Sequence, residues 1–154
     1  FYANAAQVEL LDRTLELLPE LKVVMNHLGF CPNMSDEITI DDDLRPRFSV
    51  TIPPDSLEAV TRVAQRKHVY VHFSGMYAFS QEPYPYPGMA AMVEPIFAAF
   101  GPERLLMASD YPWIYRNPGY PETLALLDEH LPDLSDEERD LIRGGNAARL
   151  FSFS

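Results

Sequence analysis

The stretch RLLMASDYPW, residues 104–113, decides the fold. Its residues 105–108 are all apolar, and the polar residues Ser109 and Asp110 follow at once. A short, continuously apolar run is typical of a parallel strand that is covered on both faces. In parallel α/β folds the functional groups gather at the carboxyl ends of the strands. The stretch therefore predicts a buried parallel strand that presents a carboxylate, Asp110.

Two earlier stretches follow the same pattern. Residues 21–25 form a short apolar run that leads to His27, and residues 69–73 form another that leads to Ser74. Between and around these runs, apolar residues recur at helical spacing. The predicted helices cover residues 5–18, about 55–67, 89–100 and 121–130, and a last helix begins after Ser135 and is interrupted near residues 144–145.

This alternation of helices and strands predicts an α/β fold with three parallel strands in one sheet. Periodicity alone leaves two architectures open, an open doubly wound sheet and part of a barrel. No glycine-rich phosphate loop follows any of the three strands, which disfavours a nucleotide-binding open sheet.

Two loops are unusual. Residues 30–55 are too long for an ordinary strand-to-helix connection, and they contain two β-like patches, residues 37–40 and 48–52. We predict an excursion that covers a pocket, with a surface loop without a role as the alternative. Residues 82–88, EPYPYPG, form a second loop, whose Tyr84 and Tyr86 could line a pocket or make a rigid turn.

Composition limits the function classes. The 154 residues suffice for one domain, and the net charge of −11 disfavours binding to nucleic acid or to anionic membranes. The single cysteine, Cys31, cannot form an intramolecular disulfide and is expected to be inert. No apolar run reaches the length of a membrane helix. We therefore expect a cytoplasmic protein that acts on a small molecule.

Asp110 and His27 are the candidate catalytic residues. A carboxylate at a strand end can bind a metal or take a proton from water, although an aspartate there can also cap a turn. A neutral imidazole can ligate a metal or polarise a carbonyl, or simply bond to a backbone carbonyl. We expect a packing role for His72 and surface positions for His68 and His130. The sequence contains no Gly-x-Ser-x-Gly, His-Glu-x-x-His or Cys-x-x-Cys motif, so serine hydrolases and zinc fingers lose their main support.

The chain resembles the amidohydrolase-related (amidohydrolase 2) family. The matching segments are NHLG at 26–29, VYVHFSGMY at 69–77, FGPERLLMASDYPW at 100–113 and GGNAARLF at 144–151. The resemblance implies a (β/α)₈ TIM barrel, of which the three strands here are the sixth, seventh and eighth.

The resemblance also implies roles for individual residues. Asp110 is the expected metal ligand or general base, and His27 is expected to activate water or polarise the substrate. The divalent metal is expected to be zinc. We predict that the substrate is contacted by Ser74, Tyr77, Tyr111 and Trp113. His72 stands where many members carry a lysine, so no role is transferred to it.

Two departures from the family qualify these expectations. Members usually carry a His-x-His pair on the first strand and a further histidine on the fifth, and this sequence has neither. A complete barrel needs about 250 residues. We therefore interpret residues 1–154, which begin with Phe1, as the C-terminal part of one barrel domain. We expect this chain alone to bind no catalytic metal tightly, and to self-associate through the open edge of its first strand.

Three functions are compatible with the sequence. The leading hypothesis is a metal-dependent hydrolase that opens a small cyclic ester (lactone) or amide with activated water. A decarboxylase of the same family is the second. The third is a half-barrel fragment that is not catalytic and has an interaction role.

Overall fold

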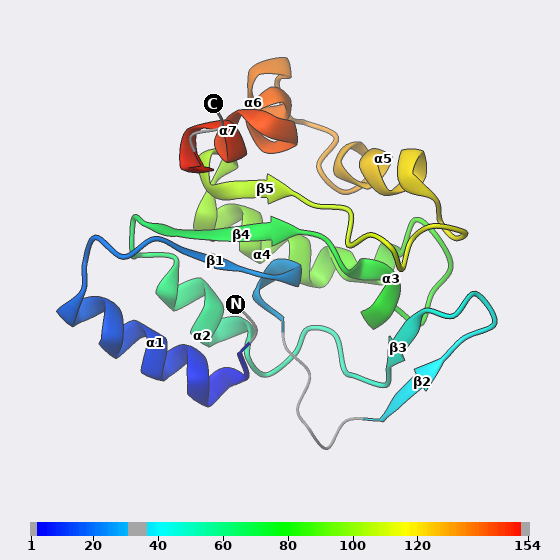
Figure 1. Ribbon diagram of the computed structural model, residues 1–154, viewed down its shortest axis with the longest axis horizontal. Helices are drawn as coiled ribbons and strands as arrows, with labels where there is room; N and C mark the ends of the chain where they lie inside the picture. The colour runs from blue at the N-terminus through cyan, green and yellow to red at the C-terminus, as the bar shows by residue number, and fades with distance from the viewer. Residues whose placement is uncertain (1–2, 31–36, 152–154) are drawn as a thin grey trace.

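The three apolar runs form one parallel sheet. The structure is a computed structural model, and it describes residues 3–30 and 37–151. In it, β4 (Val69–Phe73) lies between β1 (Val23–Met25) and β5 (Leu105–Met107) (Figure 1). Val71 is the Cα partner of both Met25 and Leu105. The carboxyl ends of all three strands therefore meet at one edge of the sheet, as predicted.

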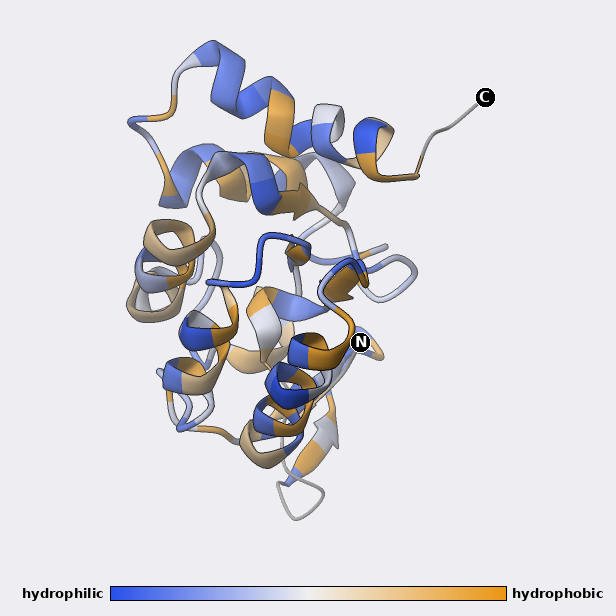
Figure 2. Ribbon diagram, turned by 90° about the vertical axis from the view of Figure 1, so that its left-hand side faces the viewer, coloured by the Kyte–Doolittle hydropathy of each residue, from blue (hydrophilic) through white to orange (hydrophobic). Residues whose placement is uncertain are grey.

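Helices bury one face of this sheet. The helix α2 (Leu57–Val63) packs against α4 (Ala90–Phe100), and α1 (Ala5–Leu17) packs against α2 (Figure 1). The side chains of β4 alternate accordingly: Val69, Val71 and Phe73 are at most 1% exposed, whereas Tyr70 and His72 are half-buried. In α1 three members of the predicted apolar stripe, Val8, Leu11 and Leu15, are buried, whereas the fourth, Leu18, lies just past the helix and is 53% exposed. The turns of α1 carry both hydrophobic and hydrophilic residues (Figure 2).

The sequence predicts caps for two helices, with Asp55 or Ser56 as the N-cap of α2 and a capping box of Ser135 and Glu138 at the last helix. Ser135 caps α6 (Asp136–Asp140) through a capping box with Glu138, as expected from the sequence. Ser56 makes no side-chain capping bond, because its own backbone is already helical (φ −73°, ψ −13°). Of the two residues that the sequence offers, Ser56 therefore takes the N-cap position but does not cap α2 through its side chain.

The same helix is also shorter than the predicted range of 55–67. The backbone N–H groups of Gln65 and Arg66 bond to the carbonyls of Arg62 and Val63, three residues back. These tighter turns end the α-helical pattern after Val63.

The excursion after β1 contains an antiparallel hairpin, which is formed by β2 (Ile38–Ile40) and β3 (Pro46–Phe48). The first predicted β-like patch, residues 37–40, coincides with β2 to within one residue. The second is predicted at residues 48–52, but the strand β3 begins earlier, at Pro46, and ends at Phe48. Proline lacks an N–H and is tolerated as the first residue of a strand. Val50 and Ile52, which suggested a strand, pack as partly buried side chains against the core.

After β5 the chain forms a loop and then a series of helices. Here α5 (Tyr120–His130) and α6 are followed by a π-helical turn (Leu141–Gly145) and α7 (Asn146–Phe151), so the predicted interruption at residues 144–145 is a change of helix type. The remaining short elements are α3 (Met76–Phe79) and the 3₁₀ turns His27–Gly29, Pro87–Met89 and Pro102–Arg104.

Three further expectations from the sequence concern Cys31, membrane-spanning helices and the open edge of β1. Cys31 falls outside the described residues. Within 3–30 and 37–151, no helix is long and apolar enough to cross a bilayer. β1 is an outer strand of the described sheet, and self-association through its edge stays a prediction.

Asn146 ties the last helix to the sheet. It is 2% exposed, and its Nδ2 donates to the carbonyl oxygens of Pro102 (2.7 Å) and Leu105 (2.8 Å). Replacing Asn146 by Ala leaves both acceptors without this donor, so we expect the free energy of unfolding to fall by about 1–3 kcal/mol in urea titrations. Gln65→Ala, at an exposed position, is the control. Equal stabilities of the two variants would contradict this assignment.

Candidate active site

Three strand ends bring His27, Ser74 and Asp110 together. His27 follows β1, Ser74 follows β4 and Asp110 follows β5. The His27 Nδ1 atom lies 2.9 Å from Ser74 Oγ, and His27 Nε2 lies 3.7 Å from Asp110 Oδ2. The sequence prediction that these three residues lie at one level of the sheet is therefore confirmed by the geometry.

His27 is held as a buried imidazole. It is 6% exposed and packs edge-on to the ring of Phe79. Burial lowers the pKa of His27 below its usual value of 6.5, although the nearby Asp110 carboxylate acts in the opposite direction. The side chain is therefore neutral at neutral pH, which suits a group that polarises a carbonyl or orients water.

The backbone at both candidate residues is unusual. His27 has φ +50° and Asp110 has φ +61°, in the left-handed region that residues other than glycine seldom adopt. Such conformations cost about 1–3 kcal/mol and concentrate at functional sites. The turns at the ends of β1 and β5 thus aim both side chains at one point, at an energetic cost.

The two oxygens of the Asp110 carboxylate differ in their contacts. Its Oδ2 accepts a hydrogen bond from the Tyr77 hydroxyl at 2.7 Å and also faces His27. Its Oδ1 has no partner among the described residues, and the side chain is 24% exposed. One oxygen is therefore fixed, while the other can accept a proton or bind a cation.

His72 and Asn26 belong to the same surroundings, which the sequence reasoning missed. His72 Nδ1 lies 2.9 Å from Asn26 Oδ1, on the face of β4 that the helices leave half-buried. Burial lowers the pKa of His72, and the neighbouring His27 lowers it further. The signal available in the sequence was alternation, since residues 70, 72 and 74 share one face.

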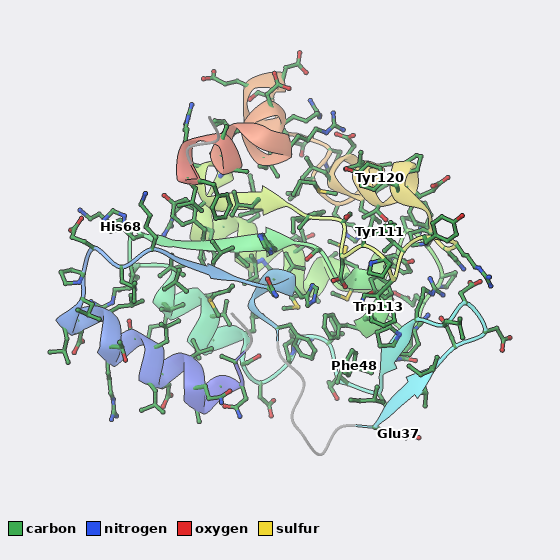
Figure 3. All side chains as sticks on the ribbon, viewed as in Figure 1. Glu37, Phe48, His68, Tyr111, Trp113 and Tyr120 are labelled. Carbon is green, nitrogen blue, oxygen red and sulfur yellow. The ribbon has the colours of Figure 1, made fainter. Side chains whose placement is uncertain are left out.

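The remaining histidines lie elsewhere. His68 precedes β4, at the opposite end of the sheet from Tyr111 and Trp113, and pairs with Glu20 at 3.2 Å (Figure 3). His130 ends α5 and donates from Nε2 to the Pro85 carbonyl at 2.8 Å. Neither histidine has a described contact with His27, Ser74 or Asp110.

Not all predicted substrate contacts come together. Tyr111 (69% exposed) and Trp113 (45%) line an open groove of about 340 Å³ with Leu44, Tyr115 and Arg116. His27, Ser74 and Tyr77 do not line this groove. Tyr111 and Trp113 lie on the side of the molecule toward which the strands of the sheet point (Figure 3). Contact of Tyr111 and Trp113 with substrate stays a prediction.

The two loops occupy different places. The β2–β3 hairpin packs on α3, where the rings of Phe48 and Phe79 lie 5.3 Å apart and Gln81 Nε2 donates to the Phe48 carbonyl. Residues 82–88 pack against α5, through the Tyr84 hydroxyl and the Glu122 carbonyl. Tyr86 is 3% exposed and lines a cavity of about 10 Å³ with Ser74, which has room for about one water and not for a substrate.

The donor set fits a metal only in part. A carboxylate oxygen and an imidazole nitrogen are ligands that zinc accepts. The Ser74 contact to His27 Nδ1 also resembles the outer contacts that orient metal-binding histidines. Catalytic zinc sites use three protein ligands, however. No cluster of three or more His, Cys, Asp or Glu side chains with metal-binding geometry occurs within 3–30 and 37–151.

A family model described as amidohydrolase matches residues 2–153. The chain belongs to the amidohydrolase family. No curated protein matches the chain significantly.

Solved structures show the fold of this family member. An amidohydrolase from Burkholderia multivorans with bound zinc is 21% identical, with a TM-score of 0.71 over 97% of this chain and 50% of that one. A Pseudomonas putida protein described as a 2-pyrone-4,6-dicarboxylic acid hydrolase is 20% identical, with a TM-score of 0.67 over 97% and 50%. A manganese-bound dihydroxybenzoic acid decarboxylase from Polaromonas is 14% identical, with a TM-score of 0.54 over 94% and 38%.

The chain spans about half the length of the first two of these amidohydrolase structures. This fits a partial barrel, with its parallel sheet and covering helices. The numbering of β1, β4 and β5 as strands six to eight stays a prediction.

Gly75 makes room for His27, which can be tested. Gly75 has φ +81°, and a Cβ there would lie 2.6 Å from His27 Nδ1. Gly75→Ala should therefore displace the imidazole and destabilise the chain, by an amount of order 1–3 kcal/mol from the positive φ alone. Gly144→Ala is the matched control, because a Cβ at Gly144 meets nothing within 4 Å. The measurement is urea unfolding, together with the chemical shifts of the His27 ring. An unmoved His27 ring in Gly75→Ala would show that the site is not packed as described.

Proposed function

We propose that the protein carrying this chain is a metal-dependent hydrolase that opens a small cyclic ester or amide with activated water. Membership of the amidohydrolase family supports the reaction class. The similarity to a protein described as a pyrone dicarboxylic acid hydrolase supports a lactone as the substrate class.

The Oδ1 atom of Asp110, which has no partner among the described residues, is the observation that carries this proposal. It is the acceptor of a partly exposed carboxylate whose other oxygen is occupied by Tyr77. A carboxylate fixed in this way can take a proton from a water molecule without turning away from it. Beside it lies a neutral imidazole that can hydrogen-bond to the carbonyl oxygen of a substrate.

The reaction then divides between the two side chains. Asp110 accepts a proton from water as the water oxygen forms a bond to the carbonyl carbon. In this proposal the Ser74 hydroxyl, whose Oγ lies 2.9 Å from His27 Nδ1, donates to that nitrogen. Nε2 then carries the ring proton and donates to the carbonyl oxygen, where negative charge develops. When the ring carbon–oxygen or carbon–nitrogen bond breaks, the proton on Asp110 passes to the leaving atom.

A divalent metal, with zinc as the expected ion, would be held by Asp110 through the oxygen that does not take the proton, and would supply Lewis-acid activation of the water. The further ligands would come from side chains other than His27 and Asp110. Ser74 and Tyr77 would orient His27 and Asp110 and would not bind the metal.

A decarboxylase is the second candidate, and the similarity to the dihydroxybenzoic acid decarboxylase favours it. In that reaction a carbon–carbon bond to a carboxylate breaks, CO₂ leaves and a proton is added to the ring carbon. The free carboxylate oxygen of Asp110 could serve proton transfer in either reaction.

Substitution of Asp110 tests both candidates. We expect Asp110→Asn to lower turnover by about 10²–10⁴-fold, because the amide cannot accept the proton, while the unfolding transition is retained. Asp133→Asn, at an exposed position, should leave turnover unchanged. The probes are 2-pyrone-4,6-dicarboxylate for hydrolysis and a dihydroxybenzoate for decarboxylation.

The product distinguishes the reactions. Incorporation of ¹⁸O from labelled water into the opened pyrone indicates a hydrolase, and release of CO₂ from the benzoate indicates a decarboxylase. Near-normal turnover of either probe by Asp110→Asn would contradict the role of Asp110.

A further inference from the structure

The turn of the β2–β3 hairpin holds a buried arginine, Arg45. It is 6% exposed, in a segment where the neighbouring Leu44 is 65% exposed. Asp41 accepts from Arg45 Nε at 2.9 Å and lies 2.7 Å from its Nη2. Burial by itself would lower the pKa of Arg45, but the bonds to Asp41 raise it, so the guanidinium keeps its charge.

Arg45 also joins the hairpin to the loop that follows β5. Its Nη1 donates to the Asn117 carbonyl at 2.6 Å, and Asn117 Nδ2 donates in return to Asp43 Oδ2 at 3.0 Å. These two bonds link segments more than 70 residues apart in sequence. This loop also contains Asp110, so the hairpin is hydrogen-bonded to the segment that carries the candidate base.

The guanidinium faces the ring of Tyr77. Arg45 Cζ lies 5.8 Å from the ring centroid, within the range of a cation–π contact. Tyr77 is 3% exposed, and its hydroxyl is the donor to Asp110 Oδ2. The cationic guanidinium therefore helps to hold the orientation of this ring, and with it the position of the hydroxyl that bonds to Asp110.

We propose that Arg45 is a positioning residue of this site: it holds the Tyr77 ring so that the hydroxyl fixes Asp110 Oδ2 and leaves Oδ1 to react. The proposal rests on the proposed function for its effect on turnover. It assigns the long excursion after β1 a part in the chemistry beyond covering a pocket. Arg45 itself is too deeply buried to be a substrate ligand, so its effect passes through Tyr77.

The experiment uses Arg45→Met, Arg45→Lys and Tyr77→Phe, with Arg47→Met as the matched control. Arg47 lies on the same hairpin, but its described partners are the Ser80 carbonyl and Asp41, and it makes no described contact with Tyr77. The first readout needs no substrate: it is the proton NMR resonance of the Tyr77 hydroxyl, assigned by its loss in Tyr77→Phe. We expect Arg45→Met to shift or broaden this resonance, Arg45→Lys to retain it in part and Arg47→Met to leave it in place.

The second readout is kcat and KM with the pyrone probe. We expect Arg45→Met to lower kcat by about 10–100-fold with little change in KM, since misplacement of a reacting group acts on the chemical step. Arg45→Met combined with Tyr77→Phe should be no slower than the slower single variant. Arg47→Met should stay within about twofold of the parent protein, as expected for a residue that makes no contact with the site.

The two failures can be told apart. Absence of turnover in the parent protein would count against the proposed function. The hydroxyl resonance of Tyr77 would still test the role of Arg45, because that readout needs no substrate. An unchanged resonance in Arg45→Met would overturn the proposal. So would an equal shift in Arg47→Met, because it would indicate general loosening of the hairpin.

Discussion

The contacts of the His27 imidazole with the residues that follow β4 and β5 make one site out of three separate segments. Ser74 holds one ring nitrogen at 2.9 Å, and Asp110 faces the other at 3.7 Å. The contact depends on parallel register, which brings the three carboxyl ends to one level. It also depends on Gly75, which leaves the space that the ring occupies. Without either condition, neither the neutral imidazole nor the aimed carboxylate would persist.

A second set of contacts, from Tyr77 and Arg45, fixes the Asp110 carboxylate. Tyr77 occupies Asp110 Oδ2, and Arg45 lies over the ring of Tyr77. The reacting groups sit on the ends of sheet strands, while the groups that orient them come from α3 and from the hairpin. This division is common in α/β folds, where a rigid sheet positions the chemistry and the loops tune it.

The sequence predicted the sheet and most of its helices because apolar runs and helical periodicity report burial directly. It also predicted that His27, Ser74 and Asp110 lie together, since strand ends in a parallel sheet share one edge. It could not predict Arg45, because an arginine in an acidic run usually lies in solvent, and only tertiary contacts with Asp41 and Asn117 bury it. Alternation places His72 on the face of Ser74, but it does not say which face the helices cover, so the surroundings of His72 were not predicted. Ser56 failed as a cap because Pro54 already begins the turn, with its carbonyl accepting from Leu57.

The state of the His27 ring tests the account most directly. Long-range ¹H–¹⁵N NMR of the chain, recorded as a function of pH, reports both its protonation and its tautomer. The account predicts protonation with a midpoint below 6.5, because burial disfavours the charged ring, and a single Nε2–H tautomer above that midpoint. On lowering the pH from 6.5, the folded state would bind fewer protons at His27 than the unfolded state, so that part of the stability would be lost. A midpoint at or above 6.5, or a mixture of tautomers as in a solvent-exposed histidine, would contradict the account.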